Sequence, residues 1–295
     1  MNDYIIGIDI GGTHFRIGSV NSNNEIKNFK KIRTSSVIKN NVLQDIIAFL
    51  SEYISDLNVK AIAIGFPATL DKNRQKVLQA PNIKFMENLP VVSEISKALN
   101  VPVFAERDVS MALLFDMKKY EIPDEGIICG IYFGTGIGNA ISINGKLLIG
   151  KNGTAGELGH IPVDKSEVFC GCGNYGCIES LAGGKYLAKI QKEHFTETPI
   201  SDLFLKHENN FLINEFIDRM SIAVSTEINI LDPDYVLVGG GVLNMKNFPK
   251  NLLREKIILH SRKPLPAENL NLILTDDEPE KCISGAALYA KKNLL

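Results

Sequence analysis

Residues 5–18 read IIGIDIGGTHFRIG, and residues 128–141 read ICGIYFGTGIGNAI. When the two stretches are aligned without gaps, Gly7 falls on Gly130 and Gly11 falls on Gly134. In each copy an apolar strand reaches a turn of glycine and threonine and continues as a second strand rather than as a helix. Any two strands that end on glycine look alike, but two glycines in register favour a duplication. The repeat therefore predicts two similar α/β domains that face a cleft.

The rest of the chain agrees with α/β architecture, because short β-branched runs alternate with longer segments of helical period. We expect domain 1 at residues 1–118, completed by a C-terminal helix at 281–295, and domain 2 at residues 119–280. The polar segment 118–126 is the expected junction. Further strands are expected at 59–67, 101–106, 234–242 and 269–277, and helices at 41–57, 108–119 and 216–231.

Composition and charge exclude some classes of protein. The chain has 295 residues and a formal net charge of −2, and its Lys and Arg are scattered. We therefore expect neither nucleic acid nor a membrane as a partner. The N-terminus does not resemble a signal peptide, so we expect a cytoplasmic protein with reduced cysteines. Cys129 and Cys282 stand alone in apolar segments, where we expect buried thiols.

The two glycine turns are candidate phosphate sites. Glycine has no Cβ, so backbone N–H groups there can approach a phosphate chain, and Thr13 or Thr135 can add a hydroxyl donor. For any one turn, a purely structural role is the safer interpretation, but several such turns together favour nucleotide binding. The expected phosphate contacts are Gly11, Gly12, Thr13, Gly134, Thr135 and Gly136.

Two further features fit a nucleotide site. Asp9 precedes the first turn, where its carboxylate could hold Mg²⁺ directly or through water. Three glycines, Gly239, Gly240 and Gly241, end a strand in the second half and would let a flat ring lie on the backbone. Together these features predict a site for a nucleotide triphosphate with Mg²⁺. The stretch GCGNYG at 171–176 matches a dinucleotide-binding pattern by chance, since no strand precedes it.

Asp108 lies between a predicted buried strand and an apolar helix. Its carboxylate could cap the helix, which the local sequence favours, or act as a general base at the carboxyl end of a strand. Arg107 beside it could be a surface or ion-paired arginine, or a set of donors for hydroxyl groups.

Residues 168–177, VFCGCGNYGC, contain three of the five cysteines. A disulfide knot, a redox pair and a metal site are the alternatives. No C-x-x-C pair occurs, and disulfides are rare in the cytosol. With His160 upstream, Cys170, Cys172 and Cys177 form a tetrahedral set of the kind that holds structural Zn²⁺ without an open position. Participation of the cysteines is better supported by this pattern than that of His160.

Taken in order, several motifs resemble the ROK family (repressors, open reading frames and sugar kinases), which has the actin-like ATPase (ribonuclease H-like) fold. The resemblance covers essentially the whole chain. It rests on DIGGTHFRIG (9–18), GFPA (65–68), ERD (106–108), GTGIG (134–138), GTAGELGHI (153–161), CGCGNYGCIES (170–180) and DPDYVLVGGGV (232–242).

The resemblance implies an enzyme that transfers the γ-phosphoryl group of ATP to the 6-hydroxyl of a hexose. Asp108 would be the base that takes the hydroxyl proton, and the glycine turns would hold the phosphates. A homodimer is also implied. The implied sugar contacts are Gly65, Asn82, Arg107, Asp108, Glu157, His160 and Glu179.

Two departures from the family pattern bear on the substrate. Most family kinases carry Asn where this chain has Arg107, and Lys where it has His14. The first departure, together with FPATLDKNRQ at 66–75, favours D-allose as the hexose. Glucose, fructose or an N-acetylhexosamine such as N-acetylmannosamine is the alternative. A sugar-responsive repressor is the alternative of another class, and we expect no DNA binding by the family's usual N-terminal domain, because few residues precede the first turn.

Overall fold

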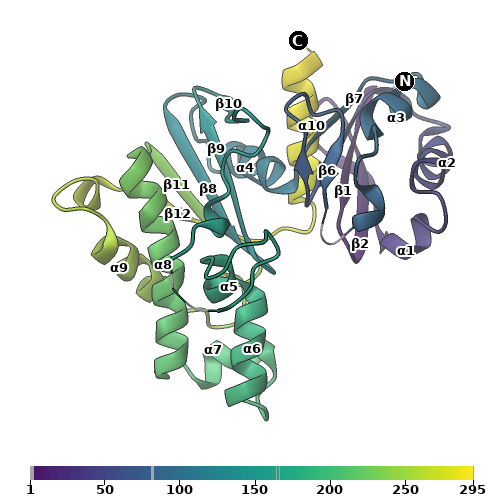
Figure 1. The fold of residues 1–295 in the computed structure, drawn as a ribbon. Helices are drawn as coiled ribbons and strands as arrows, with labels where there is room; N and C mark the ends of the chain where they lie inside the picture. Colours follow the sequence, from purple (N-terminus) through teal and green to yellow (C-terminus); the bar gives the residue numbers. More distant parts are fainter. Residues whose placement is uncertain (1–2, 81–82, 164, 166, 295) are drawn as a thin grey trace. The chain divides into compact units, whose positions relative to one another are not determined.

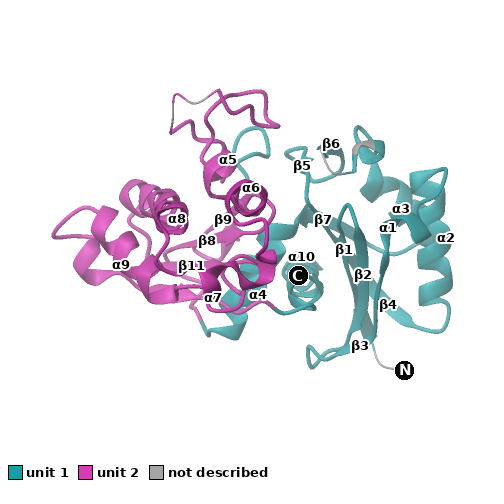
Figure 2. Cartoon of the chain, turned by 90° about the horizontal axis from the view of Figure 1, so that it is seen from below, with its two compact units in different colours: residues 1–121, 149–155, 278–295 teal, residues 122–148, 156–277 magenta. Residues whose placement is uncertain are grey.

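The computed structural model describes residues 3–80, 83–163, 165 and 167–294, which form two compact units (Figure 2). Unit 1 comprises residues 1–121, 149–155 and 278–295, and unit 2 comprises residues 122–148 and 156–277. The chain first passes between them inside the polar segment 118–126. Segment 149–155 returns to unit 1, which no sequence pattern indicates.

Unit 1 is built on a five-stranded sheet with the order β3-β2-β1-β4-β7, of which β1, β2 and β7 are labelled in Figure 1. β1 pairs antiparallel with β2 and parallel with β4, and β4 pairs parallel with β7. The strands are β1 Asp3–Ile10, β2 His14–Val20, β3 Ile26–Arg33, β4 Asn58–Phe66 and β7 Val103–Arg107.

Helices cover both faces of this sheet. Ile6, Ile8 and Ile10 of β1 pack in a cluster with α2 and α3, whereas Ile5 packs with α4 and α10. This alternation follows the two-residue period of a strand, and each fully buried side chain of this size stabilises the fold by about 1.5–3 kcal/mol. The helices are α1 Thr34–Val37, α2 Val42–Ile54, α3 Val91–Leu99, α4 Asp108–Lys119 and α10 Lys281–Leu294.

Unit 2 contains a second five-stranded sheet with the order β10-β9-β8-β11-β12. β8 pairs antiparallel with β9 and parallel with β11, and β11 pairs parallel with β12. The strands are β8 Ile127–Phe133, β9 Ile137–Ile143, β10 Lys146–Leu147, β11 Tyr235–Gly239 and β12 Leu272–Leu274. The helices are α5 Glu179–Ala182, α6 Gly184–His194, α7 Leu203–Lys206, α8 Phe211–Leu231 and α9 Lys250–His260.

Short elements complete the described part of the chain. The hairpin β5–β6 belongs to unit 1, and the remaining pieces are 3₁₀ turns. None of the helices among the described residues is long and apolar enough to cross a membrane. The bounds are β5 Thr69–Leu70, β6 Val77–Gln79, η1 Lys84–Met86, η2 Leu158–His160, η3 Ile200–Asp202 and η4 Ala267–Asn269.

The two sheets have the same order and the same strand directions, which confirms the predicted duplication. The gapless alignment is right for the first strand of each copy and one residue out in the second. Ile10 pairs with Phe15 across four residues, whereas Phe133 pairs with Ile137 across three. Gly18 therefore corresponds in the sheets to Ala140, because the second turn is one residue shorter.

Candidate functional site

Asp108 is the first residue of α4 and follows β7 directly. The N-cap of α4 is Arg107, whose side chain makes no capping hydrogen bond, so Asp108 is not itself the N-cap residue. Asp108 Oδ1 instead accepts a hydrogen bond from the N–H of Val109 at 2.8 Å. A Cβ on Gly65, at the end of β4, would lie 3.5 Å from Asp108 Cα, so the structure brings these two predicted residues together.

The environment of Asp108 keeps its carboxyl group protonated up to nearly neutral pH. Burial and the negative charge of Asp9 raise the pKa of Asp108 from 3.8 to about 7, and the positive charge of Arg107 opposes this shift. A carboxyl group with a pKa near 7 can exchange a proton close to neutral pH, which is the property required of a general base.

Asp9 is buried at the end of β1 and is paired with Arg16 of β2. Arg16 Nη1 donates to Asp9 Oδ2 at 2.5 Å. Burial raises the pKa of Asp9, whereas the charge and hydrogen bond of Arg16 lower it. Sequence reasoning missed Arg16, although the hairpin register places it directly opposite Asp9.

Arg107 has only 8% of its surface exposed, so the alternative of a surface arginine is wrong. Its charge acts on Asp108, as the pKa of that carboxyl shows. Asn82, the other residue predicted on this side of the sugar, lies outside the described residues.

Thr34 donates hydrogen bonds to two carbonyl groups of the first glycine turn. The Thr34 hydroxyl donates to the Gly11 carbonyl at 2.6 Å, and the Thr34 N–H donates to the Thr13 carbonyl at 3.0 Å. Thr34 is almost fully buried and begins α1. This residue was also missed, because its contact crosses more than twenty positions of sequence.

The second glycine turn is bound in the same way by the start of α6. The N–H of Gly184 donates to the Gly134 carbonyl, and the N–H of Lys185 donates to the Thr135 carbonyl, both at 2.9 Å. The paired glycines Gly183 and Gly184 were the missed signal here, because a Cβ on Gly183 would lie 3.0 Å from Gly136 Cα.

These contacts orient the peptide groups of both turns. A trans peptide unit is planar, with its C=O and N–H pointing in opposite directions. The N–H groups of Gly12, Thr135 and Gly136 therefore point away from Thr34 and α6. The second turn thus offers two adjacent donors of the kind that binds phosphate oxygens, and the first offers the N–H of Gly12. The N–H groups of Gly11 and Gly134, which were also predicted to contact phosphate, are already bound to the carbonyls of His14 and Gly136.

Glu179 and His160 lie around the second turn in unit 2. Glu179 Oε2 accepts from the N–H of Ile137 at 2.9 Å, directly after the turn. A Cβ at Gly136 would collide with the same carboxylate. His160 Nε2 lies 3.6 Å from Glu157 Oε2, so the structure brings Glu157 and His160 together. Glu179 contacts the glycine turn itself.

The His160 ring presents its other nitrogen to the cysteines. His160 Nδ1 is 3.4 Å from Cys170 Sγ, Cys172 Sγ is 3.7 Å from Cys177 Sγ, and all four ligand atoms lie within 4.8 Å of one another. Four ligands at zinc–sulfur distances of about 2.3 Å in a tetrahedron are separated by about 3.8 Å, so this set fits Zn²⁺. All five cysteines are free.

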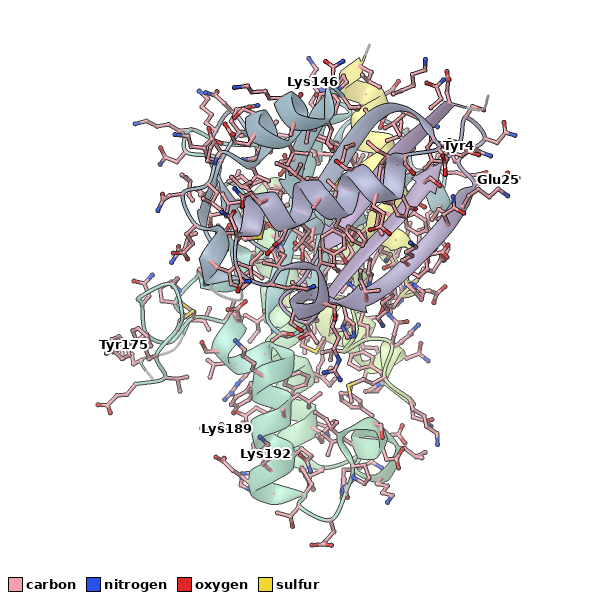
Figure 3. The ribbon with its side chains drawn as sticks, turned by 90° about the vertical axis from the view of Figure 1, so that its right-hand side faces the viewer. Tyr4, Glu25, Lys146, Tyr175, Lys189 and Lys192 are labelled. Atoms are coloured by element: carbon pink, nitrogen blue, oxygen red, sulfur yellow. The ribbon has the colours of Figure 1, made fainter. Side chains whose placement is uncertain are left out.

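The loop that carries these cysteines presents aromatic rings on its outside. Tyr175, labelled in Figure 3, projects from the loop, and its ring forms an edge contact with Phe169 at a centroid distance of 5.3 Å. More than half of each side chain is exposed. The cysteines are thus the part of the loop that turns toward His160.

The glycines at the end of β11 differ from one another. A Cβ at Gly239 would overlap the Thr275 hydroxyl, and Gly240 has a φ of +99° and faces the backbone of Phe133. Gly241 has no atom near its missing Cβ. Packing therefore accounts for two of these glycines, and only Gly241 faces open space.

The two isolated cysteines differ in their surroundings. Cys129 is fully buried, as predicted. Cys282 is only partly buried, and its Sγ lies 3.8 Å from the Asp108 carbonyl oxygen. Burial and the charges of Asp9 and Asp108 raise the pKa of the Cys282 thiol. The sequence did not indicate that Cys282 neighbours the site.

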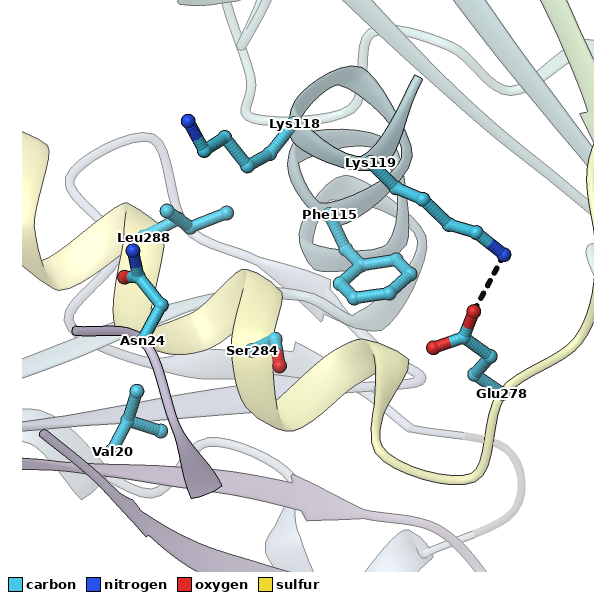
Figure 4. Close-up of a pocket in the computed structure, with 8 residues that line it drawn as sticks. All are labelled: Val20, Asn24, Phe115, Lys118, Lys119, Glu278, Ser284 and Leu288. Atoms are coloured by element: carbon cyan, nitrogen blue, oxygen red, sulfur yellow. Dashed lines mark hydrogen bonds and ion pairs between the residues drawn. The ribbon is translucent and has the colours of Figure 1, made fainter. Parts of the chain in front are cut away.

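A separate pocket of about 290 Å³ lies in unit 1 against α4 and α10 (Figure 4). An ion pair of 2.5 Å between Lys119 and Glu278 stands at its edge. None of the predicted site residues is among those that line it: Val20, Asn24, Phe115, Lys118, Lys119, Glu278, Ser284 and Leu288.

Comparison with known proteins identifies relatives over nearly the whole chain. The model of the ROK family matches residues 5–293. A glucokinase of Thermotoga maritima is 27% identical over 278 residues, which cover 86% of this chain and 87% of the relative.

Solved structures agree. The ROK hexokinase from Thermus thermophilus matches with a TM-score of 0.79 and 25% identity over 99% of this chain and 100% of that one. A ROK transcriptional regulator, a homologue of the E. coli MLC protein, matches with a TM-score of 0.83 and 25% identity over 99% of this chain and 78% of that one. The predicted fold class, an actin-like ATPase fold with two α/β sheets, is confirmed.

Proposed function

Since the chain belongs to the ROK family, we propose that it is an ATP-dependent sugar kinase that phosphorylates the 6-hydroxyl of a hexose. The observation that carries this proposal is the carboxyl group of Asp108, which lies at the junction of β7 and α4 and has a pKa raised to about 7. The likeness to a glucokinase and to a hexokinase supports it.

In the proposed reaction, Asp108 accepts the proton of the 6-hydroxyl as the hydroxyl oxygen attacks the γ-phosphorus. The bond from that phosphorus to the bridging oxygen of ATP breaks, and ADP leaves with the bond's electrons. Asp108 then releases its proton to water. Phosphoryl transfer depends mainly on alignment and charge neutralisation, so a single carboxylate suffices as base.

We assign the donor arrays of the two turns to the phosphates of ATP. The supporting observation is that Thr34 binds the Gly11 carbonyl and the start of α6 binds those of Gly134 and Thr135, so that the N–H groups of Gly12, Thr135 and Gly136 point to the other side, while Thr13 would donate its hydroxyl. Gly12, Thr13, Thr135 and Gly136 would donate to phosphate oxygens. The exposed glycine Gly241, with Gly239 and Gly240 behind it, would lie against the adenosine.

Asp9 is the residue that we propose for Mg²⁺. Its carboxylate is a hard oxygen ligand of the kind that Mg²⁺ prefers, and the positive charge of Arg16 compensates its buried negative charge. Mg²⁺ would neutralise charge on the β- and γ-phosphates.

His160, Cys170, Cys172 and Cys177 are the residues that we propose as Zn²⁺ ligands, on the strength of their spacing. Zn²⁺ would have a structural role. Because Nδ1 of His160 faces the cysteines, the opposite edge of its ring and Glu157 would be left to contact sugar hydroxyls. Glu179 would act beside them.

D-allose is the hexose that we propose as substrate. Arg107 is buried beside Asp108, where a guanidinium can donate to ring hydroxyls that Asn could not reach in the same way. Gly65 and Asn82 would complete this side of the sugar. Glucose or an N-acetylhexosamine is the alternative.

A coupled assay of ADP release over a panel of aldohexoses, ketohexoses and amino sugars tests both levels of this proposal. We expect turnover with ATP and Mg²⁺ and the highest kcat/KM for D-allose. Arg107→Asn should shift the preference toward glucose. Turnover of glucose alone would exclude D-allose as the substrate but would still support the proposed kinase activity.

A sugar-responsive regulator is the second candidate, favoured by the likeness to the solved regulator. Sugar binding by calorimetry without ADP release from any sugar would select this candidate over the kinase.

We further propose a cytoplasmic location and a homodimer. The five free thiols support the first, and the second rests on the family resemblance. Light scattering on the purified protein tests the dimer.

A further inference from the structure

Unit 1 contains a buried ion pair that the proposed chemistry does not use. Arg74 Nε donates to Glu106 Oε2 at 2.7 Å, and the exposed fractions of the two residues are 8% and 0%. Arg74 lies between β5 and β6 with a φ of +57°, a conformation that side chains of this size rarely adopt. Because burial of two charges is costly, such a pair points to a specific role.

Arg74 also binds the returning segment 149–155. Its Nη1 donates to the carbonyl of Gly153 at 3.0 Å. Gly153 has a φ of +84°, and a Cβ there would lie 2.5 Å from the Leu70 carbonyl and 2.9 Å from Arg74 Nη1. The segment therefore rests directly on the β5–β6 hairpin. Along the chain it leads to Glu157, a proposed sugar contact.

Glu106 extends the same network to the start of α4. Its Oε1 accepts from the Arg107 N–H at 2.8 Å and from the Ser110 hydroxyl at 3.5 Å. These two groups flank Asp108 in sequence. One carboxylate thus receives Arg74 on one oxygen and the first turn of the base-bearing helix on the other.

We propose that Arg74 is a positioning residue for the hexose site. Through Glu106 it fixes the backbone that presents Arg107 and Asp108, and through Gly153 it fixes the segment that leads to Glu157. The inference rests on the proposed function for the identity of these sugar contacts, but the network itself is a feature of the fold.

Arg74 Nη1 also donates to the Asp71 carbonyl at 3.3 Å within the hairpin, and the bonds of Arg74 to Glu106 and to Gly153 can be separated by mutation. Arg74→Met removes both, whereas Arg74→Lys supplies one ammonium that can pair with Glu106 but cannot also reach Gly153. Lys76→Met is the matched control, because Lys76 is an exposed cation on the same hairpin. Each variant is assayed for kcat, for KM of the hexose and of ATP, and for peptide-level hydrogen exchange.

We expect Arg74→Met to raise the hexose KM at least tenfold and to lower kcat, with the ATP KM within twofold of wild type. Amide exchange should rise at least tenfold in segments 106–110 and 149–155. Arg74→Lys should restore kcat and the slow exchange of 106–110, while 149–155 still exchanges fast and the hexose KM stays high. Lys76→Met should match wild type.

Wild-type kinetics and exchange in Arg74→Met would overturn the proposal. Equal changes in both KM values with faster exchange throughout unit 1 would also overturn it, since they indicate a general loss of stability. If the wild-type protein phosphorylates no sugar, the proposed function fails separately, and local exchange at 106–110 and 149–155 still decides whether Arg74 couples them.

Discussion

Replacement of Asp108 by asparagine is expected to remove activity and to stabilise the protein at the same time. Burial and the charge of Asp9 raise the pKa of Asp108 from 3.8 to about 7. The folded protein therefore holds this proton more tightly than the unfolded chain does. The contribution of Asp108 to stability is present at acidic pH and is lost as the pH rises from 3.8 through about 7.

The size of the effect follows from the two pKa values. At about 1.4 kcal/mol per pKa unit, the raised pKa destabilises the folded state by about 4 kcal/mol at pH 8, where both states ionise, and by about 2 kcal/mol at pH 5, where only the unfolded chain does. These are upper limits, because Asp108 keeps partial contact with solvent. Asparagine has a similar shape and no charge, so it should stabilise the fold more at pH 8 than at pH 5, by up to about 2 kcal/mol.

Two measurements on the Asp108→Asn variant test this reasoning. Loss of a general base should lower kcat by about 10²- to 10⁴-fold in the ADP-release assay, while calorimetry finds the hexose affinity within about threefold of wild type. Urea unfolding at pH 5 and pH 8 measures the gain in stability. Glu94→Gln removes an exposed carboxylate of unit 1 and serves as the control.

An Asp108→Asn variant with full kcat would refute the assignment of the base. A stability gain that is the same at both pH values would refute the raised pKa of Asp108, whatever happens to the activity.

The other predictions concern the same site. The kcat/KM of the wild-type enzyme should rise about tenfold per pH unit below pH 7 and level off above it, because only ionised Asp108 accepts a proton; a flat profile between pH 5 and 8 contradicts this. Cys177→Ser should lose bound zinc by elemental analysis and raise the hexose KM, whereas metal-free wild-type protein would exclude the zinc site. Gly136→Ala should raise the KM of ATP at least tenfold, because the added Cβ would push the turn and the Glu179 carboxylate apart, and it should raise the hexose KM as well, since Glu179 is a proposed sugar contact. An unchanged KM of ATP would show that the turn does not contact ATP.

The sequence was most informative where periodicity dictates burial. The helix expected at 41–57 is α2, where Ile46 and Leu50 are one turn apart and both side chains are fully buried. The repeat predicted that each unit opens with two strands joined by a glycine turn, and β1–β2 and β8–β9 have this form. Such features depend on neighbours in the chain, so local patterns are enough to find them.

Contacts that depend on the register of a hairpin were harder to predict from the sequence. The pairing of Arg16 with Asp9 requires a four-residue turn, and the repeat suggested turns of equal length in both copies. A one-residue difference moves every partner in the second strand. Thr34 and Arg74 were missed for a related reason, since their partners are distant in sequence and only the folded chain brings them together.

The differences between the two copies carry an argument of their own. In both turns carbonyl groups accept hydrogen bonds from another element of the same unit, so the duplication retained the same backbone arrangement. The side chains diverged: Asp9 pairs with Arg16 in the first copy, whereas the corresponding pair in the second is Tyr132 and Gly138. Two equivalent ligand sites would call for the same side chains in both copies. A carboxylate in the first copy alone fits the proposed role of Asp9 as the ligand of a single Mg²⁺.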